Sequence, residues 1–221
     1  MDDTLWAFSL NARDTYEEMY WKYGYDRYFD SFEHYYLLYQ RRNLDLWAEY
    51  ADGKVTKEEL NRQRYLYPLE AVGAGDSTLA KAYERDALAM IPTKSKLMPH
   101  AREVLEYLSG KYNLYILSNG FKELQSHKMR SSGIDEYFKK VVLSDDIGIL
   151  KPWPEIFHFA LSTTQSELNN SLMIGDSWEN DIVGAAGVGM HQVFYNLSGR
   201  TDLPFAPTYQ ITDLKDLFNF L

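Results

Sequence analysis

The segment Leu172–Asp181 constrains the fold of this chain more than any other. It begins with three consecutive apolar residues bounded by Gly175, a pattern typical of a short strand buried on both faces of a parallel sheet. Asp176 follows this strand directly, and Asp181 comes five residues later, where an apolar-faced helix is expected to start. Because open α/β sheets carry their chemistry at the carboxyl ends of strands, two carboxylates there suit a hard divalent cation. The alternative is that both aspartates only cap the helix.

Strand-like and helix-like segments alternate from about residue 92 to the C-terminus. The predicted strands are 112–117, 141–143, 172–174 and 192–195. The predicted helices are 99–110, 121–130, one from about 154, one after 181, and one over 214–221. Such alternation is typical of an α/β fold in which helices cover both faces of a parallel sheet.

Residues 11–91 have a different, helical and unusually aromatic pattern. Tyr16, Met19, Tyr20 and Tyr23 fall at i, i+3, i+4 and i+7, which indicates one face of a helix. Such stripes usually form the core of a helical bundle, although one or two aromatic rings could line a pocket for a flat ligand. We therefore expect an α/β core formed by residues 1–10 and 92–221, with an all-helical module, residues 11–91, inserted near the N-terminus.

The charge balance and the residue types that are missing exclude several classes of function. With 32 acidic and 23 basic side chains, the net charge is −9, which repels nucleic acids and anionic membranes on average. The chain has no cysteine, so disulfides, thiolate zinc sites and cysteine nucleophiles are excluded. No apolar run approaches the roughly 18 residues of a membrane span, and the acidic start does not resemble a signal peptide. We expect a soluble cytoplasmic protein, a monomer or a homodimer, with no nucleic-acid or membrane partner.

Two predicted strand ends and one predicted loop carry polar residues that suit a single kind of reaction. Ser118, Asn119 and Gly120 follow a strand, Lys151 lies in a loop, and Asp176 follows the next strand. Taken singly, the first group could be only a turn, and the lysine could be solvated. Together they offer groups for phosphate oxygens, a fixed cation and a metal ligand, which are the parts that phosphoryl transfer needs.

In this order and spacing, the residues resemble the motifs of the haloacid dehalogenase (HAD) superfamily of hydrolases. The second motif of that family is an apolar strand ending in Ser or Thr, matched by Tyr115–Ser118. Its third is a lysine often followed by proline, matched by Lys151, and its fourth is Gly-Asp with a further acid, matched by Asp176 and Asp181. The resemblance implies a Rossmann-like parallel sheet, the HAD fold, with a mobile helical cap.

The first motif, a strand ending in Asp-x-Asp-x-Thr, is matched only by its tail. Aligning Thr4 with the family's threonine puts Asp2 at the second aspartate and the nucleophilic aspartate two places earlier, before Met1. The chain as written then lacks the nucleophile and its strand. We expect an artificially shortened start rather than a true pseudoenzyme. A third possibility is that Asp2 or Asp3 acts from a distorted register.

The resemblance also implies a mechanism and a cofactor. An aspartate attacks phosphorus to give an aspartyl-phosphate, which water then cleaves, and Asp2 serves as the acid and base. Mg²⁺ is the implied cofactor, held by the backbone carbonyl of Asp2, by Asp176, and by Asp181 as ligand or outer support. Lys151 would offset negative charge. True haloacid dehalogenases use no metal and lack the second aspartate, so Asp2 favours a phosphatase.

The substrate is implied by two further similarities. Residues 46–56 resemble the cap of bacterial house-cleaning pyrimidine 5′-nucleotidases, and Ser118–Phe121 is similar to their second motif. Ser118, Asn119 and the amide of Gly120 would then hold the phosphate of a pyrimidine nucleoside monophosphate such as UMP, dUMP or dTMP. Three alternatives remain open. Trp47 and Tyr50 of the first segment could only pack the cap. The enzyme could be a phosphatase for phosphoglycolate or a sugar phosphate, or the protein could bind Mg²⁺ and phosphate without turnover.

Overall fold

The structure, a computed structural model, describes residues 1–221, which divide into two compact units. We call Met1–Phe8 together with Ser95–Leu221 the core unit, and Ser9–Lys94 the helical unit. The chain therefore leaves the core unit after its first residues, forms the helical unit, and returns. The expected division, residues 1–10 with 92–221 and residues 11–91, stays a prediction.

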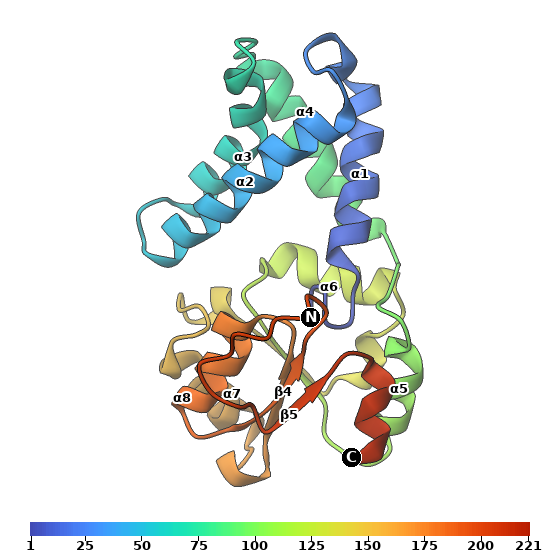
Figure 1. The fold of residues 1–221 in the computed structure, drawn as a ribbon, viewed down its shortest axis with the longest axis vertical. Helices are drawn as coiled ribbons and strands as arrows, with labels where there is room; N and C mark the ends of the chain where they lie inside the picture. The colour runs from blue at the N-terminus through green and yellow to red at the C-terminus, as the bar shows by residue number, and fades with distance from the viewer. The chain divides into compact units, whose positions relative to one another are not determined.

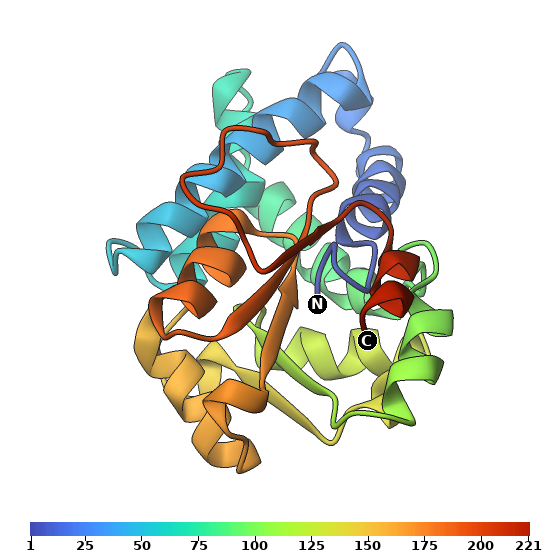
Figure 2. The same ribbon diagram turned by 60° about the horizontal axis from the view of Figure 1, so that its bottom comes forward.

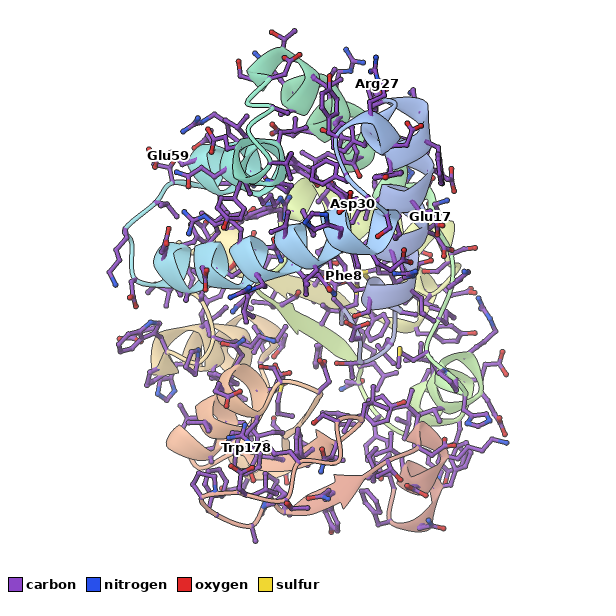
Figure 3. The ribbon with its side chains drawn as sticks, turned by 45° about the horizontal axis from the view of Figure 1, so that its top comes forward. Phe8, Glu17, Arg27, Asp30, Glu59 and Trp178 are labelled. Carbon is purple, nitrogen blue, oxygen red and sulfur yellow. The ribbon has the colours of Figure 1, made fainter.

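The helical unit consists of four α-helices and two short 3₁₀ turns. They are α1 (Phe8–Lys22), η1 (Tyr25–Arg27), α2 (Phe32–Ala51), α3 (Lys57–Ala71), α4 (Ser77–Met90) and η2 (Ile91–Thr93). Figure 1 labels the α-helices. The second, third and fourth of the α-helices begin at side-chain caps. Thr56 and Glu59, the latter labelled in Figure 3, form a capping box at the start of α3. Glu59 N donates to Thr56 Oγ1 at 3.2 Å, and Thr56 N donates to Glu59 Oε2 at 2.8 Å.

The aromatic stripes of the helical unit meet in its interior. Tyr16, Tyr39, Tyr65 and Tyr83 are all buried, one from each helix in chain order. Their polar ends are satisfied within the cluster, because the hydroxyls of Tyr16 and Tyr39 lie 2.7 Å apart and Tyr83 Oη donates to the Tyr16 carbonyl at 2.9 Å. These rings therefore pack as core.

The core unit alternates strands with helices. Its strands are β1 (Tyr115–Ser118), β2 (Lys140–Leu143), β3 (Leu172–Gly175), β4 (His191–Tyr195) and β5 (Tyr209–Ile211). Its α-helices are α5 (Ala101–Ser109), α6 (Lys122–Ser131), α7 (Pro154–Thr164) and α8 (Gly184–Gly187). Shorter turns are η3 (Asp135–Tyr137), η4 (Ser144–Asp146), η5 (Leu168–Asn170), the π-helical η6 (Trp178–Val183) and η7 (Leu214–Asn219). The sequence did not predict β5, and the expected last helix is the 3₁₀ helix η7.

Helices cover both faces of the strands (Figure 2). On one face, Val104 of α5 packs with Val193 of β4 and Leu217 of η7. On the other face, Phe157 of α7 packs against Ala185 of α8. Every strand pair is parallel, so all carboxyl ends within a sheet lie at the same edge.

The strands form two sheets rather than the single sheet that was expected. One has the order β1-β2 and the other β3-β4-β5. A cavity of about 960 Å³ within the core unit is lined by residues of both β1 and β3, among them Ile116 and Ile174. Leu172, Met173 and Ile174 are therefore only half-buried, and the prediction that this strand is buried on both faces is wrong.

The helical segment after β3 begins earlier than expected. It starts with η6 at Trp178, and Ser177 caps it by accepting a hydrogen bond from Asn180 N at 3.2 Å. The ring of Trp178, which Figure 3 labels, is buried against Phe194, with centroids 5.2 Å apart. Because Ser177 is the cap, Asp181 lies inside the helical segment, and its carboxylate is available for other contacts.

Candidate active site

The first residues of the chain lie at the carboxyl ends of β1 and β3. Thr4 Oγ1 donates to Asp176 Oδ1 at 2.5 Å, which joins this segment to the end of β3. Gln125 Nε2 donates both to Asp2 Oδ2 at 2.9 Å and to Ser118 Oγ at 3.1 Å, which joins it to the end of β1. Side chains that were predicted from distant parts of the sequence thus come together, as expected for the edge of a parallel sheet.

Lys151 and Asp181 form a buried ion pair beside these strand ends. Lys151 Nζ lies 2.5 Å from Asp181 Oδ1, and the two side chains are 7% and 6% exposed. The ammonium also donates to the Leu117 carbonyl at 3.1 Å, and Asp181 Oδ2 accepts from Ser177 N at 3.1 Å. The alternative that Lys151 is a solvated surface lysine is therefore wrong.

Asn119 holds the backbone of Lys151 in place. Lys151 N donates to Asn119 Oδ1 at 2.8 Å, and Asn119 Nδ2 donates back to the Lys151 carbonyl at 3.0 Å. This reciprocal pair ties the turn after β1 to the lysine loop. Phosphate binding by Ser118, Asn119 and Gly120 stays a prediction, and in this arrangement the Gly120 amide donates to Ser118 Oγ at 3.1 Å.

Asp176 has the character of a cation ligand. Its carboxylate is half-buried and forms no ion pair, and burial raises the pKa of Asp176 even though Thr4 donates a hydrogen bond to it. A partly desolvated carboxylate that pairs with no cationic side chain suits a hard divalent cation. Asp176 could hold one, and the resemblance adds the backbone carbonyl of Asp2 and the carboxylate of Asp181 as further ligands or outer support.

The side chains of the three expected metal ligands do not gather into one cluster. No group of three or more His, Cys, Asp or Glu side chains is arranged for a metal ion. Asp2 pairs with Lys128, with Nζ at 3.0 Å from Oδ1, and Asp181 pairs with Lys151. Of the three carboxylates, Asp176 alone forms no ion pair, so the donor set compatible with a cation is this carboxylate together with main-chain oxygen.

Two residues of α6 that the sequence analysis did not single out contact Asp2. These are Gln125 and Lys128, both buried and three residues apart on one helix face. Burial would raise the pKa of Asp2, but the charge of Lys128 and the hydrogen bonds from both residues lower it below its ordinary value. A polar i, i+3 pair following the Ser118 strand is the only sequence signal for this contact, and it is weak.

The space beside β3 explains why a glycine precedes Asp176. A Cβ atom added at Gly175 would overlap the carboxylate and Cβ of Asp181. Any larger residue there must displace Asp181 and with it the buried pair to Lys151. Gly175 is therefore required by the packing of the site.

We expect Gly175→Ala to lower the free energy of unfolding by about 1–3 kcal/mol, the usual cost of overpacking a rigid site. Chemical denaturation measures this change. Gly187→Ala is the matched control, because an added Cβ there meets nothing within 4 Å, and we expect it to be neutral or slightly stabilising. Equal stability of the two variants would contradict the assignment.

Comparison with known proteins gives one matching family model and several similar proteins. Residues 1–189 match the family model of the haloacid dehalogenase-like hydrolases. The chain is 30% identical to the pyrimidine 5′-nucleotidase YjjG of Escherichia coli, covering 83% of this chain and 80% of that protein. It is 29% identical to the phosphoserine phosphatase of Thermus thermophilus, covering 79% and 67%.

A solved structure is similar over the whole chain. The crystal structure of the HAD-hydrolase YfnB of Bacillus subtilis, bound to magnesium, has a TM-score of 0.87 at 26% identity and covers 100% of this chain and 95% of that one. The predicted fold class, an α/β Rossmann-like core with a helical cap, is confirmed. None of the helices is both long and apolar enough to span a membrane.

Proposed function

The chain belongs to the haloacid dehalogenase-like hydrolases, and from this we propose that it is a Mg²⁺-dependent phosphatase acting on pyrimidine nucleoside 5′-monophosphates. One observation supports the proposal most. Asp2, Ser118, Lys151 and Asp176 all lie at the carboxyl ends of β1 and β3, where hydrogen bonds join their segments. Phosphoryl transfer depends on positioning and on stabilising negative charge, and these side chains offer both.

The proposed reaction proceeds through two displacements at phosphorus. In the family that the chain resembles, the attacking aspartate stands two positions before the residue that Asp2 matches. Its oxygen forms a bond to phosphorus while the bond to the nucleoside oxygen breaks, and Asp2 gives its proton to that leaving oxygen. Asp2 then takes a proton from the water that cleaves the aspartyl-phosphate, which regenerates both carboxyl groups.

Lys151 supplies a fixed positive charge for this reaction. Its ammonium is held by Asp181 and by the Leu117 carbonyl, and its backbone is held by Asn119. Because these contacts hold the ammonium before substrate binds, its position needs little change while the phosphoryl group is transferred.

A bound Mg²⁺ would offset the negative charge of the phosphoryl oxygens. Asp176 and the main-chain oxygen of Asp2 would hold it, with Asp181 as outer support. The half-buried Asp176 carboxylate, which pairs with no cationic side chain, supports this assignment. So does the magnesium bound in the similar B. subtilis structure.

The nucleotide substrate is supported by the relatives. The similar proteins of E. coli and Streptococcus pneumoniae are both named pyrimidine 5′-nucleotidases, at 30% and 27% identity. In the segment 46–56, the rings of Trp47 and Tyr50 stand edge to face with centroids 5.9 Å apart, as expected for packing within the helical unit. The base preference therefore rests on the relatives and on the resemblance.

We expect kcat/KM for dUMP to exceed that for phosphoglycolate by about tenfold or more, because the nucleoside offers binding contacts that the smaller ester lacks. Steady-state release of inorganic phosphate measures both values, with protein expressed from its own gene. A tenfold advantage for phosphoglycolate would refute the nucleotidase proposal. Binding of Mg²⁺ and dUMP without turnover would favour the non-catalytic alternative instead.

A further inference from the structure

Gln125 and Lys128 turn their polar ends toward Asp2 from within the protein interior. Their side chains are 0% and 3% exposed, respectively. Lys128 Nζ donates to both carboxylate oxygens of Asp2, at 3.0 and 3.1 Å, while Gln125 Nε2 donates to Oδ2 at 2.9 Å. A lysine and a glutamine are seldom buried to this degree, and here both contact a single carboxylate.

The orientation of the Gln125 amide is fixed at a cost in stability. Its Nε2 also donates to Ser118 Oγ at 3.1 Å, while its Oε1 is buried without a hydrogen-bond partner. Turning the amide over would place Oε1 against the Asp2 carboxylate, so that two acceptors face each other and the hydrogen bond to Asp2 is lost. A buried acceptor without a partner is unfavourable and calls for an explanation. Holding Asp2 at a fixed position relative to Ser118 provides one.

Gly120 provides the room for this arrangement. A Cβ atom added there would overlap the Gln125 amide nitrogen. The glycine therefore does more than offer its backbone amide, because any other residue would push Gln125 away from Asp2. The same position thus shapes both the turn after β1 and the contact to Asp2.

The Lys128 ammonium is held from the other side by aromatic rings. Its Nζ lies 4.7 Å from the centroid of Trp6 and 5.0 Å from that of Phe8. Cation–π attraction and burial leave this ammonium little freedom to move. It is therefore a fixed anchor for the carboxylate rather than a flexible surface charge.

We propose that Gln125 and Lys128 are positioning residues that set the orientation of the Asp2 carboxyl group for proton transfer. This inference rests on the proposed function. These donors suit the ionised carboxylate, which acts in the second step: an O–H bond of the attacking water breaks and an O–H bond to Asp2 forms, while the water oxygen bonds to phosphorus and the bond from phosphorus to the aspartyl oxygen breaks. Such a transfer needs the carboxylate oxygen within hydrogen-bond reach of that water, and a displacement of about 1 Å costs on the order of 100-fold in rate.

The test separates turnover from substrate binding in protein expressed from its own gene. We expect Lys128→Met to lower kcat for dUMP by on the order of 100-fold, with KM within about threefold of the wild type, because substrate is held elsewhere. Lys128→Arg, which keeps the charge and the donors, should recover about tenfold or more of the loss. Gly120→Ala, which displaces Gln125, should also lower kcat.

Lys122→Met is the matched control on the same helix, since Lys122 is 68% exposed and pairs only with Asp146 at 3.1 Å. We expect it to leave kcat unchanged. A folded Lys128→Met variant with kcat within threefold of the wild type would overturn the inference, as would equal kcat values for the Met and Arg variants. If Lys128→Met does not fold, the Arg and Gly120→Ala variants decide.

A second readout needs no turnover. Asp2→Asn and Lys128→Met are compared singly and together by thermal unfolding, and we expect their shifts in Tm to be non-additive by about 2 °C or more. Additive shifts would overturn the contact on which the inference depends. A wild-type protein that hydrolyses no phosphate ester would instead refute the proposed function, and the Tm cycle would still decide the contact.

Discussion

Lys151→Met is expected to lower the free energy of unfolding by about 3–5 kcal/mol, because it leaves a buried carboxylate without its partner. Lys151 Nζ and Asp181 Oδ1 lie 2.5 Å apart, and neither side chain is more than 7% exposed. The Ser177 amide is the remaining hydrogen-bond donor to Asp181. Hydrolysis should be lost as well, since the fixed positive charge near the phosphoryl group disappears. Chemical denaturation and phosphate release measure the two effects.

The double variant Lys151→Met/Asp181→Asn separates the pair from the packing around it. Because the buried charge is then gone, we expect it to recover about half or more of the lost stability, with no recovery of hydrolysis. The exposed pair of Lys122 and Asp146 is the control, and Lys122→Met should cost less than about 1 kcal/mol. If Lys151→Met is as stable as Lys122→Met, the pair of Lys151 and Asp181 does not behave as a buried ion pair.

Asp176→Asn is expected to remove Mg²⁺-dependent turnover, a loss of about 100-fold or more, while leaving the fold intact. The amide keeps an acceptor for the hydroxyl of Thr4, which lies 2.5 Å from Asp176 Oδ1. Because burial raises the pKa of Asp176, the ionised form at neutral pH is disfavoured in the folded protein. Removing that charge should therefore leave stability equal or slightly higher.

Thermal unfolding with and without Mg²⁺ tests this variant independently of activity. A cation that binds only the folded protein raises its Tm, and we expect this rise in the wild type and not in Asp176→Asn. The control is Asp213→Asn, whose carboxylate contacts His100 at 2.7 Å and takes no part in the site. If Asp176→Asn keeps the Mg²⁺-dependent rise, the metal is held elsewhere.

Local patterns predicted the elements of the core unit well and their burial less well. The apolar run before Gly175 predicted a strand, and β3 spans Leu172–Gly175. Its burial depends on what lies beside it, and Ile174 faces a cavity that is also lined by Ile116 of β1. No local pattern shows that two strands fail to pair. The expectation of full burial therefore failed for a tertiary reason.

Asp176 and Lys151 could be predicted because their chemistry is tied to strand ends and loops that the sequence marks. Gln125 and Lys128 could not, since a lysine on a helix is by default a solvated residue. Their burial follows from contacts with Asp2, Trp6 and the end of β1, and Asp2 lies 126 positions from Lys128 in the sequence. Only the three-dimensional structure brings these residues together.

The most direct test of the central claim is phosphate release from dUMP by protein expressed from its own gene, measured with Mg²⁺, after removal of metal with EDTA, and after Mg²⁺ is restored. We expect turnover with Mg²⁺, loss of turnover with EDTA, and recovery when Mg²⁺ is added back. Turnover that EDTA does not change, or the absence of hydrolysis of dUMP and of every other phosphate monoester tried, would contradict the assignment of this site as a Mg²⁺-dependent phosphatase.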